Sequence, residues 1–397
     1  MRYVLALAIL GACGAPQGSG DRGHHNPCRG GLSTNYNFTE NIRKLCVRPE
    51  DLNTAAEQYS FIGRYFSAHK AFDQLMGETG PQDIYFDTSD FRAHSAIEYI
   101  VEKARGSQIV IINEAHHVPY HRFFTMLLLA KLHESGFTFF GAETLSHSDT
   151  VLNNRGYPTL RSGYYTREPQ YGNLIRQAIK TGFYVFAYEA RGGVDGKLRE
   201  IEQARNIARV LEVNPKAKIL IHCGFGHLIE GKVEGWEKAM AGRVLECTGI
   251  DPLTIDQVEL SEHSDKKFEN PYYRKLNYKY FKVIRNSSVT IPVNFRIGGK
   301  SSDIFVYHPR TKLLYNRPDW LFQFYKPKFL VNDIKISFPV IIKAYLAQEN
   351  DEIAIPIDVI EVEKKADSTA LALMPGNWYT IVVENQNKQK QILKLKF

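Results

Sequence analysis

The stretch IVIINEAHHVPYHR, residues 109–122, places an apolar run of strand length directly before Glu114, His116, His117, His121 and Arg122. A continuous apolar run of this length is typical of a strand that is buried on both faces of a parallel sheet. In an open α/β sheet, ligands bind just beyond the carboxyl ends of the strands. We therefore expect the chemistry of this protein to begin where this run ends.

Further apolar runs of strand length recur along the chain and alternate with sequence of helical character. The predicted strands are residues 109–113, 138–143, 184–188, 218–222, 253–258 and 303–307, and the predicted helices are 41–76, 91–105, 119–135, 172–181, 198–213 and 233–248. This alternation predicts an α/β fold with a parallel sheet of about six strands covered by helices, over residues 41–330.

The last 60 or so residues have a different pattern, in which short alternating runs are separated by turns. Strands are predicted at 338–346, 352–357, 370–373, 378–383 and 391–397. Their spacing predicts a small C-terminal antiparallel β-sandwich domain over residues 335–397.

The N-terminus has the pattern of an export signal. Arg2 precedes a short apolar segment, so residues 1–12 are predicted to be a signal peptide. The sequence LGAC, ending at Cys13, resembles a bacterial lipobox and predicts an exported, membrane-anchored lipoprotein, lipidated at Cys13, on the periplasmic or cell-surface side. Ordinary cleavage is the alternative. Residues 13–40 are predicted to be a flexible tether. Export permits disulfides, and Cys28 could pair with Cys46, although spacing alone does not fix the connectivity.

The net charge of +7 comes mostly from residues 261–397. No nucleic-acid motif accompanies this excess, so we do not expect nucleic-acid binding. We expect this excess positive charge to attract the protein to an anionic membrane surface. A solvated basic face is the alternative interpretation.

Other candidate site residues follow later strands. The predicted strand FTFFGAE ends in Glu143, and if it lies beside the first strand, Glu114 and Glu143 face each other at roughly 5 Å. Such a pair shares a cation, or raises the pKa of one member. The sequence HCGFGH, residues 222–227, brings His227 to another strand end, whereas His222 is still inside its strand and is equally compatible with a core position.

Two more segments are candidates for the substrate side of the site. Glu189 and Arg199 could bind a ligand, with a charged helix surface as the alternative reading. The long connection 146–171 is rich in tyrosine and arginine and is predicted to be a wall over the site, with Tyr164 and Tyr165 as ligand-binding residues. A solvated surface loop is the alternative.

Assembled, these motifs resemble a known superfamily over residues 109–257. The segment NEAHHVPYHR resembles the G-E-x-H-D-x-P-x-H-H pattern of ChaN-type haem-binding lipoproteins at Glu114, His116, Pro119 and His121. Two GxxH elements with a glutamate between them, typical of TIKI and TraB-type proteins, are matched by residues 113–116, where Asn113 replaces the glycine, by Glu143 and by residues 224–227. Erythromycin esterase-like hydrolases carry G-E-x-x-H, a pattern that selects Glu114 and His117, and a family R-D-x-x-M-A-x-N helix resembles residues 199–206.

The resemblance implies a hydrolase of ester or amide bonds in a small-molecule or peptide substrate. In its metal-assisted form a divalent metal, Mn, Co or Zn, activates water, with His117 as general base. The implied metal ligands are Glu114, His116, Glu143 and His227. In its metal-free, esterase-like form His117 alone activates water, oriented by Glu114 or Glu143. In both forms Arg122 or Arg199 stabilises the oxyanion.

Two other functions are compatible with the same residues. The clustered histidines, including His121, and the tyrosines could bind haem or another iron ligand, as the ChaN-type pattern implies. The chain could also be a non-catalytic structural lipoprotein of the cell surface, whose β domain binds a partner.

Overall fold

The computed structural model describes residues 36–78, 94–280, 289–291, 302–350 and 352–397. The predicted signal peptide, nearly all of the predicted tether, the lipidation site Cys13 and Cys28 lie outside the described residues. Within them, no helix is long and apolar enough to cross a bilayer.

An eight-stranded sheet forms the centre of the molecule, and the six predicted strands are its parallel part. The strand order is β1-β9-β10-β8-β2-β5-β3-β4. The parallel strands are β10 (Ile304–Tyr307), β8 (Leu253–Asp256), β2 (Ile109–Glu114), β5 (Lys218–Gly224), β3 (Phe137–Ala142) and β4 (Tyr184–Ala187). At one edge β9 (Val289–Ile291) pairs antiparallel with β10, and β1 (His94–Ser95) pairs antiparallel with β9. The α/β prediction is confirmed.

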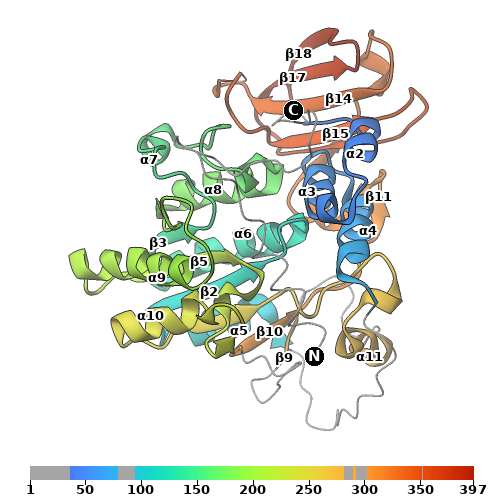
Figure 1. The fold of residues 1–397 in the computed structure, drawn as a ribbon. Coiled ribbons are helices and arrows are strands. Elements are labelled where there is room, and N and C mark those ends of the chain that lie inside the picture. The colour runs from blue at the N-terminus through green and yellow to red at the C-terminus, as the bar shows by residue number, and fades with distance from the viewer. Residues whose placement is uncertain (1–35, 79–93, 281–288, 292–301, 351) are drawn as a thin grey trace.

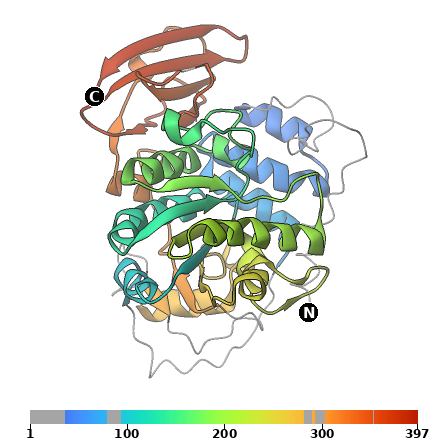
Figure 2. The same ribbon diagram turned by 90° about the vertical axis from the view of Figure 1, so that its left-hand side faces the viewer.

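Helices cover both faces of this sheet (Figure 2). Because side chains alternate along a strand, Val110 and Ile112 pack against α5 (Ala96–Ala104), α6 (Pro119–Glu134) and α8 (Pro169–Thr181). Ile109 and Ile111 pack against α9 (Gly196–Val213) and α10 (Met240–Thr248) on the opposite face. All six residues of β2 are buried, which explains why its sequence is apolar without alternation.

The structure corrects several local predictions. Strand β5 lies between β2 and β3, so the strands that end in Glu114 and Glu143 are not neighbours. The predicted helix 233–248 begins only at Met240, because a hairpin of β6 (Lys232–Val233) and β7 (Glu237–Lys238) precedes it and turns at Gly235 with φ +81°. The connection 146–171 has structure of its own, including α7 (Leu152–Arg155) and a 3-10 turn, Tyr165–Arg167.

The C-terminal region contains the predicted antiparallel sheets. A four-stranded sheet has the order β15-β14-β17-β18, formed by β15 (Asp358–Val362), β14 (Val340–Leu346), β17 (Trp378–Asn385) and β18 (Lys390–Lys396). A second sheet pairs β13 (Lys326–Lys328), which precedes residue 335, with β16 (Leu371–Leu373), and the two sheets share an apolar core. The strand predicted at 352–357 is wrong: the strand is β15, which starts after Pro356, a residue that cannot donate a ladder hydrogen bond.

Two smaller elements lie between the main sheet and the C-terminal sheets in the chain or at the margin of the main domain, beside several short 3-10 helices. They are α11 (Pro271–Tyr280) and a hairpin of β11 (Leu313–Leu314) and β12 (Arg317–Pro318).

The predicted helical segment 41–76 forms three helices, α2 (Thr39–Leu45), α3 (Leu52–Phe61) and α4 (Tyr65–Met76). A 3-10 turn at Pro49 separates the first two, and Gly63, with φ +71°, separates the last two. These helices lie between the C-terminal sheet and the main domain (Figure 1). Their apolar cluster includes Ile341 and Val359 of the C-terminal sheet, and Phe72 stacks on Phe225 beyond the end of β5. The N-terminal helices therefore cover the carboxyl ends of the central strands.

Candidate functional site

The carboxylate of Glu114, at the carboxyl end of β2, is completely enclosed by donors. Arg122 on α6 binds both of its oxygens, with Nε–Oε2 and Nη2–Oε1 distances of 2.6 Å. The nitrogens His116 Nδ1 and His222 Nε2 each lie 2.8 Å from one oxygen. Burial opposes ionisation of Glu114, but Arg122 and the two histidines hold its pKa well below the usual range. Glu114 is thus a permanent anion that orients its neighbours.

Arg122 is as deeply buried as its partner. Besides Glu114, it donates to Glu168 (3.1 Å) and to the carbonyl of His116 (2.9 Å), and its guanidinium lies 4.7 Å from the ring centre of Tyr171. Burial works against the charge, yet Glu114 and Glu168 raise the pKa of Arg122. With no exposed surface, Arg122 is placed to hold the site together rather than to meet a substrate.

A second ionic network surrounds Glu143, at the end of β3. Its Oε1 accepts from Arg199 Nη2 at 2.8 Å, and its Oε2 accepts from the backbone N–H of Gly224. Arg199 also binds Glu189 through two nitrogens, at 2.9 and 2.7 Å. Although burial opposes it, His227 and Arg199 lower the pKa of Glu143 to about 2. The two predicted ligand-side residues Glu189 and Arg199 therefore belong to the same network as Glu143.

His227 is held by a carboxylate that the motifs did not single out for this role. Its Nδ1 lies 2.9 Å from Glu200 Oε2 on α9, and its ring stacks on Trp236 with a centroid distance of 4.9 Å. Its Nε2 lies 3.0 Å from Arg199 Nη1 and 3.7 Å from Glu143 Oε1. Burial disfavours the charged ring, but Glu200 and Glu143 raise the pKa of His227.

The two networks approach each other across Gly224. A Cβ added at this position would lie 2.5 Å from His116 Nε2 and 3.0 Å from Glu143 Oε2. Gly224 thus leaves the gap that lets the His116 ring approach the Glu143 carboxylate, even though β5 separates their strands. Of the two glycines in HCGFGH, Gly224 is therefore the one that the site requires on steric grounds.

The adjacent histidines 116 and 117 enter different environments. His116 turns toward Glu114, and its ring stacks on Tyr165 at 3.8 Å and 16°. His117 turns away and stacks on Phe72 of α4 at 4.0 Å, where its Nδ1 is buried without a hydrogen-bond partner among the described residues. Burial, with the neighbouring ring of His69 and other histidines, lowers the pKa of His117 well below its usual value.

The other predicted ligand-binding residues divide in the same way. His121 is fully buried, and its Nδ1 accepts the backbone N–H of Ala115 at 3.0 Å. Tyr165 forms a wall of the site through its stack on His116, as predicted for the loop, whereas Tyr164 contacts Gln58 of α3 at 3.3 Å. Burial raises the pKa of both tyrosine hydroxyls well above 10, which disfavours the tyrosinate form that binds iron.

Glu57 on α3 is a site residue that the sequence reasoning missed. It is buried, accepts a hydrogen bond from Asn53 at 2.9 Å, and lies within electrostatic range of His116. Burial raises its pKa to about 7, against the opposing effects of His116 and Tyr164. Its sequence context, AAEQYSF, contains no motif. Only the packing of the N-terminal helices brings it here.

The predicted metal ligands lie near one another, but their carboxylates are bound to other partners. Among the described residues, no group of three or more His, Cys, Asp or Glu side chains is arranged to hold a metal ion. The reason is electrostatic, since Arg122 occupies both oxygens of Glu114, and Arg199 and a backbone N–H occupy those of Glu143. In this arrangement the donor set does not fit a divalent cation.

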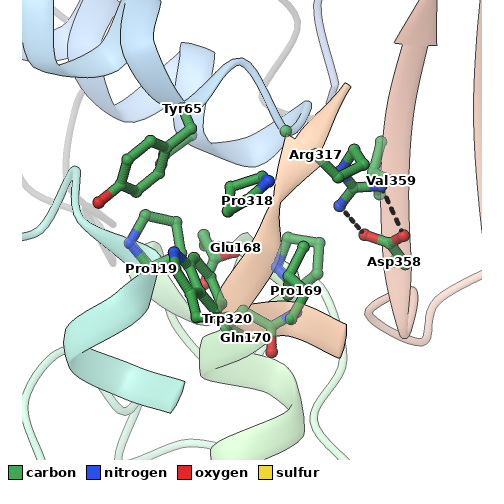
Figure 3. A pocket seen from close by; sticks show the side chains of 13 residues that line it. Tyr65, Pro119, Glu168, Pro169, Gln170, Arg317, Pro318, Trp320, Asp358 and Val359 are labelled. Carbon is green, nitrogen blue, oxygen red and sulfur yellow. Dashed lines mark hydrogen bonds and ion pairs between the residues drawn. The ribbon is translucent and has the colours of Figure 1, made fainter. Parts of the chain in front are cut away.

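A small cavity of about 20 Å³, room for about one water molecule, lies beside this site, where the N-terminal helices, the main domain and the C-terminal sheet meet (Figure 3). Glu168, the second partner of Arg122, lines it together with Pro119 and Trp320. On its far side, Arg317 forms a bidentate ion pair with Asp358 at 2.7 and 2.8 Å. The cavity is therefore connected to the Glu114 network through Glu168, which lines the cavity and binds Arg122.

Comparison with known proteins leaves the family open. No family model matches the chain, and no curated protein matches it. One solved structure, described as that of the type III effector HopBA1, is similar over 56% of this chain and 97% of its own, with 14% identity and a TM-score of 0.34. That likeness is too slight to support an argument, so the resemblance to the ChaN, TIKI and esterase-like superfamily stays a prediction.

Proposed function

We propose that this protein is a hydrolase that cleaves an ester or amide bond of a small-molecule or peptide substrate, with His116 as the general base. The observation that carries the proposal is the contact between Glu114 and His116 Nδ1 at 2.8 Å. A permanent carboxylate at Nδ1 keeps the proton on that nitrogen and leaves the lone pair on Nε2, as in other carboxylate–histidine pairs of hydrolases. His116, not His117, is therefore the base in this proposal.

In the proposed reaction, His116 Nε2 removes a proton from water while the water oxygen attacks the substrate carbonyl. The imidazolium, stabilised by Glu114, then donates that proton to the leaving oxygen or nitrogen. Arg199 supplies positive charge for the developing oxyanion, because its side chain is 21% exposed whereas that of Arg122 is not exposed. No step uses a metal, in keeping with the arginines on both carboxylates.

The proposal includes export and acylation at Cys13, which rest on the N-terminal sequence. The site itself is supported by its position, because the carboxyl ends of the central strands are where open α/β sheets bind ligands.

The test is a screen of ester and amide substrates with two matched variants, His116→Gln and His117→Gln. We expect His116→Gln to lower kcat/KM by about 10²–10⁴-fold, and His117→Gln to change it only a few-fold. Activity should withstand removal of divalent metals by a chelator. Loss of activity in His117→Gln alone would contradict the assignment. A Soret band on addition of haem, lost in His116→Gln, would favour the haem-binding alternative instead.

A further inference from the structure

The outer face of strands β17 and β18 is basic and apolar at once. Along β18 the side chains of Lys390, Ile392, Lys394 and Lys396 are exposed, while the residues between them are half-buried against the sandwich core. This alternation follows from the two-residue period of a strand. Strand β18 is also the edge of its sheet, so the row of lysines lies at the margin of the molecule (Figure 1).

Two large apolar side chains lie among these lysines. Trp378 pairs with Lys396 across the strands and is 56% exposed, and Ile392 is 59% exposed. The strand pairing places Trp378 and Ile392 on the same face of the sheet as Ile341 and Val359, since paired residues on neighbouring strands point to the same side. The N-terminal helices cover Ile341 and Val359 but leave the β17–β18 half of the face open.

The positive charge of this face is not neutralised locally. Residues 385–397 contain no aspartate or glutamate. Glu384, which lies opposite Lys390, binds Lys343 at 3.0 Å instead. Among the ion pairs of the described residues, none involves Lys390, Lys394 or Lys396.

We propose that this face, formed by Trp378, Lys390, Ile392, Lys394 and Lys396, docks on an anionic lipid bilayer. The lysines would meet the headgroups, and Trp378 and Ile392 would enter the interfacial layer, where tryptophan is enriched and lysine stems extend along apolar surface. A protein partner fits less well, because protein interfaces are depleted in lysine. In this proposal, part of the excess positive charge of residues 261–397 lies on the exposed face of β18.

The test is co-sedimentation of the full-length protein with vesicles of phosphatidylglycerol and phosphatidylcholine, compared with phosphatidylcholine alone. We expect binding to the anionic vesicles that weakens as salt rises. Each Lys→Gln change at 390 or 394 should weaken partitioning roughly fivefold, and Trp378→Ser roughly tenfold. The matched control is Lys180→Gln with Lys216→Gln, two exposed lysines that precede β4 and β5.

Fluorescence provides a second readout at Trp378. Lipids brominated in the interfacial part of the chain should quench tryptophan emission in the wild-type protein, and this quenching should be lost in Trp378→Ser. Because residues 1–35 are identical in all variants, differences between variants report on the β17–β18 face. Equal binding by the β18 variants and the control pair would overturn the proposal. So would equal binding to anionic and neutral vesicles, or binding to heparin without binding to vesicles.

Discussion

Removing the Arg122 guanidinium tests whether the buried network holds the site together. The variant Arg122→Met keeps most of the side-chain volume but leaves Glu114 and Glu168 without their shared cation, in a region where neither carboxylate is more than 3% exposed. Breaking a buried ion pair from one side costs about 3–5 kcal/mol, because the remaining charge is left unpaired in the interior. We expect the free energy of unfolding to fall by that amount at pH 7.

The assay is urea unfolding followed by tryptophan fluorescence at pH 7 and pH 5. In the variant Glu114 keeps only its two histidine partners, and we expect burial to raise its folded pKa above the unfolded value. The contribution of Glu114 to stability is then lost as pH rises. The deficit relative to wild type should therefore shrink at pH 5. The control is Lys44→Met, which breaks an equally short but exposed ion pair with Glu40, at 2.5 Å, and should change stability negligibly. A loss below about 1 kcal/mol in Arg122→Met would refute the reasoning.

Three further predictions address the geometry and the titration of the site. Gly224→Ala should reduce hydrolysis by at least about tenfold without unfolding the protein, measured as kcat/KM beside circular dichroism, because the new Cβ would displace the His116 ring. Burial lowers the pKa of His69 to about 3, so its stabilising contribution is present above pH 6.5 and is lost as pH falls toward 3. The variant His69→Phe should therefore lose less stability over that range, and an unchanged acid slope would contradict this. Burial raises the pKa of Glu57 to about 7. The contribution of protonated Glu57 to folding stability is therefore complete below about pH 4.5 and is lost as pH rises through 7. Glu57→Gln should remove this loss, which parallel urea titrations at pH 5 and pH 8 would show.

The sequence predicted the parallel sheet well because strands buried on both faces have a continuous apolar pattern. It could not predict the sheet order, since nothing in residues 218–224 indicates that β5 enters between two strands that precede it in the chain. The antiparallel C-terminal strands were also recognisable, except where Pro356 moves the start of β15. Pattern therefore determined the elements, and packing determined their neighbours.

The candidate site was most predictable where a residue lies at the end of a strand or directly after it. Glu114 and Glu143 meet that condition, and both are centres of the observed networks. The choice between His116 and His117 depended on Tyr165 and Phe72, which approach from distant segments. Such contacts leave no local signal in the sequence.

The central position of β5 has a consequence for the order in which the chain folds. During synthesis Glu114 and Glu143 emerge long before residue 218, so their strands have no partner between them until β5 has been made. The N-terminal helices complete their contacts later still, because Thr39 of α2 binds Glu361 of β15, which is synthesised 322 residues further along the chain. Contacts of such long range slow folding. A nascent chain that stalls before residue 218 should expose the edges of β2 and β3 and depend on chaperones until the central strand arrives.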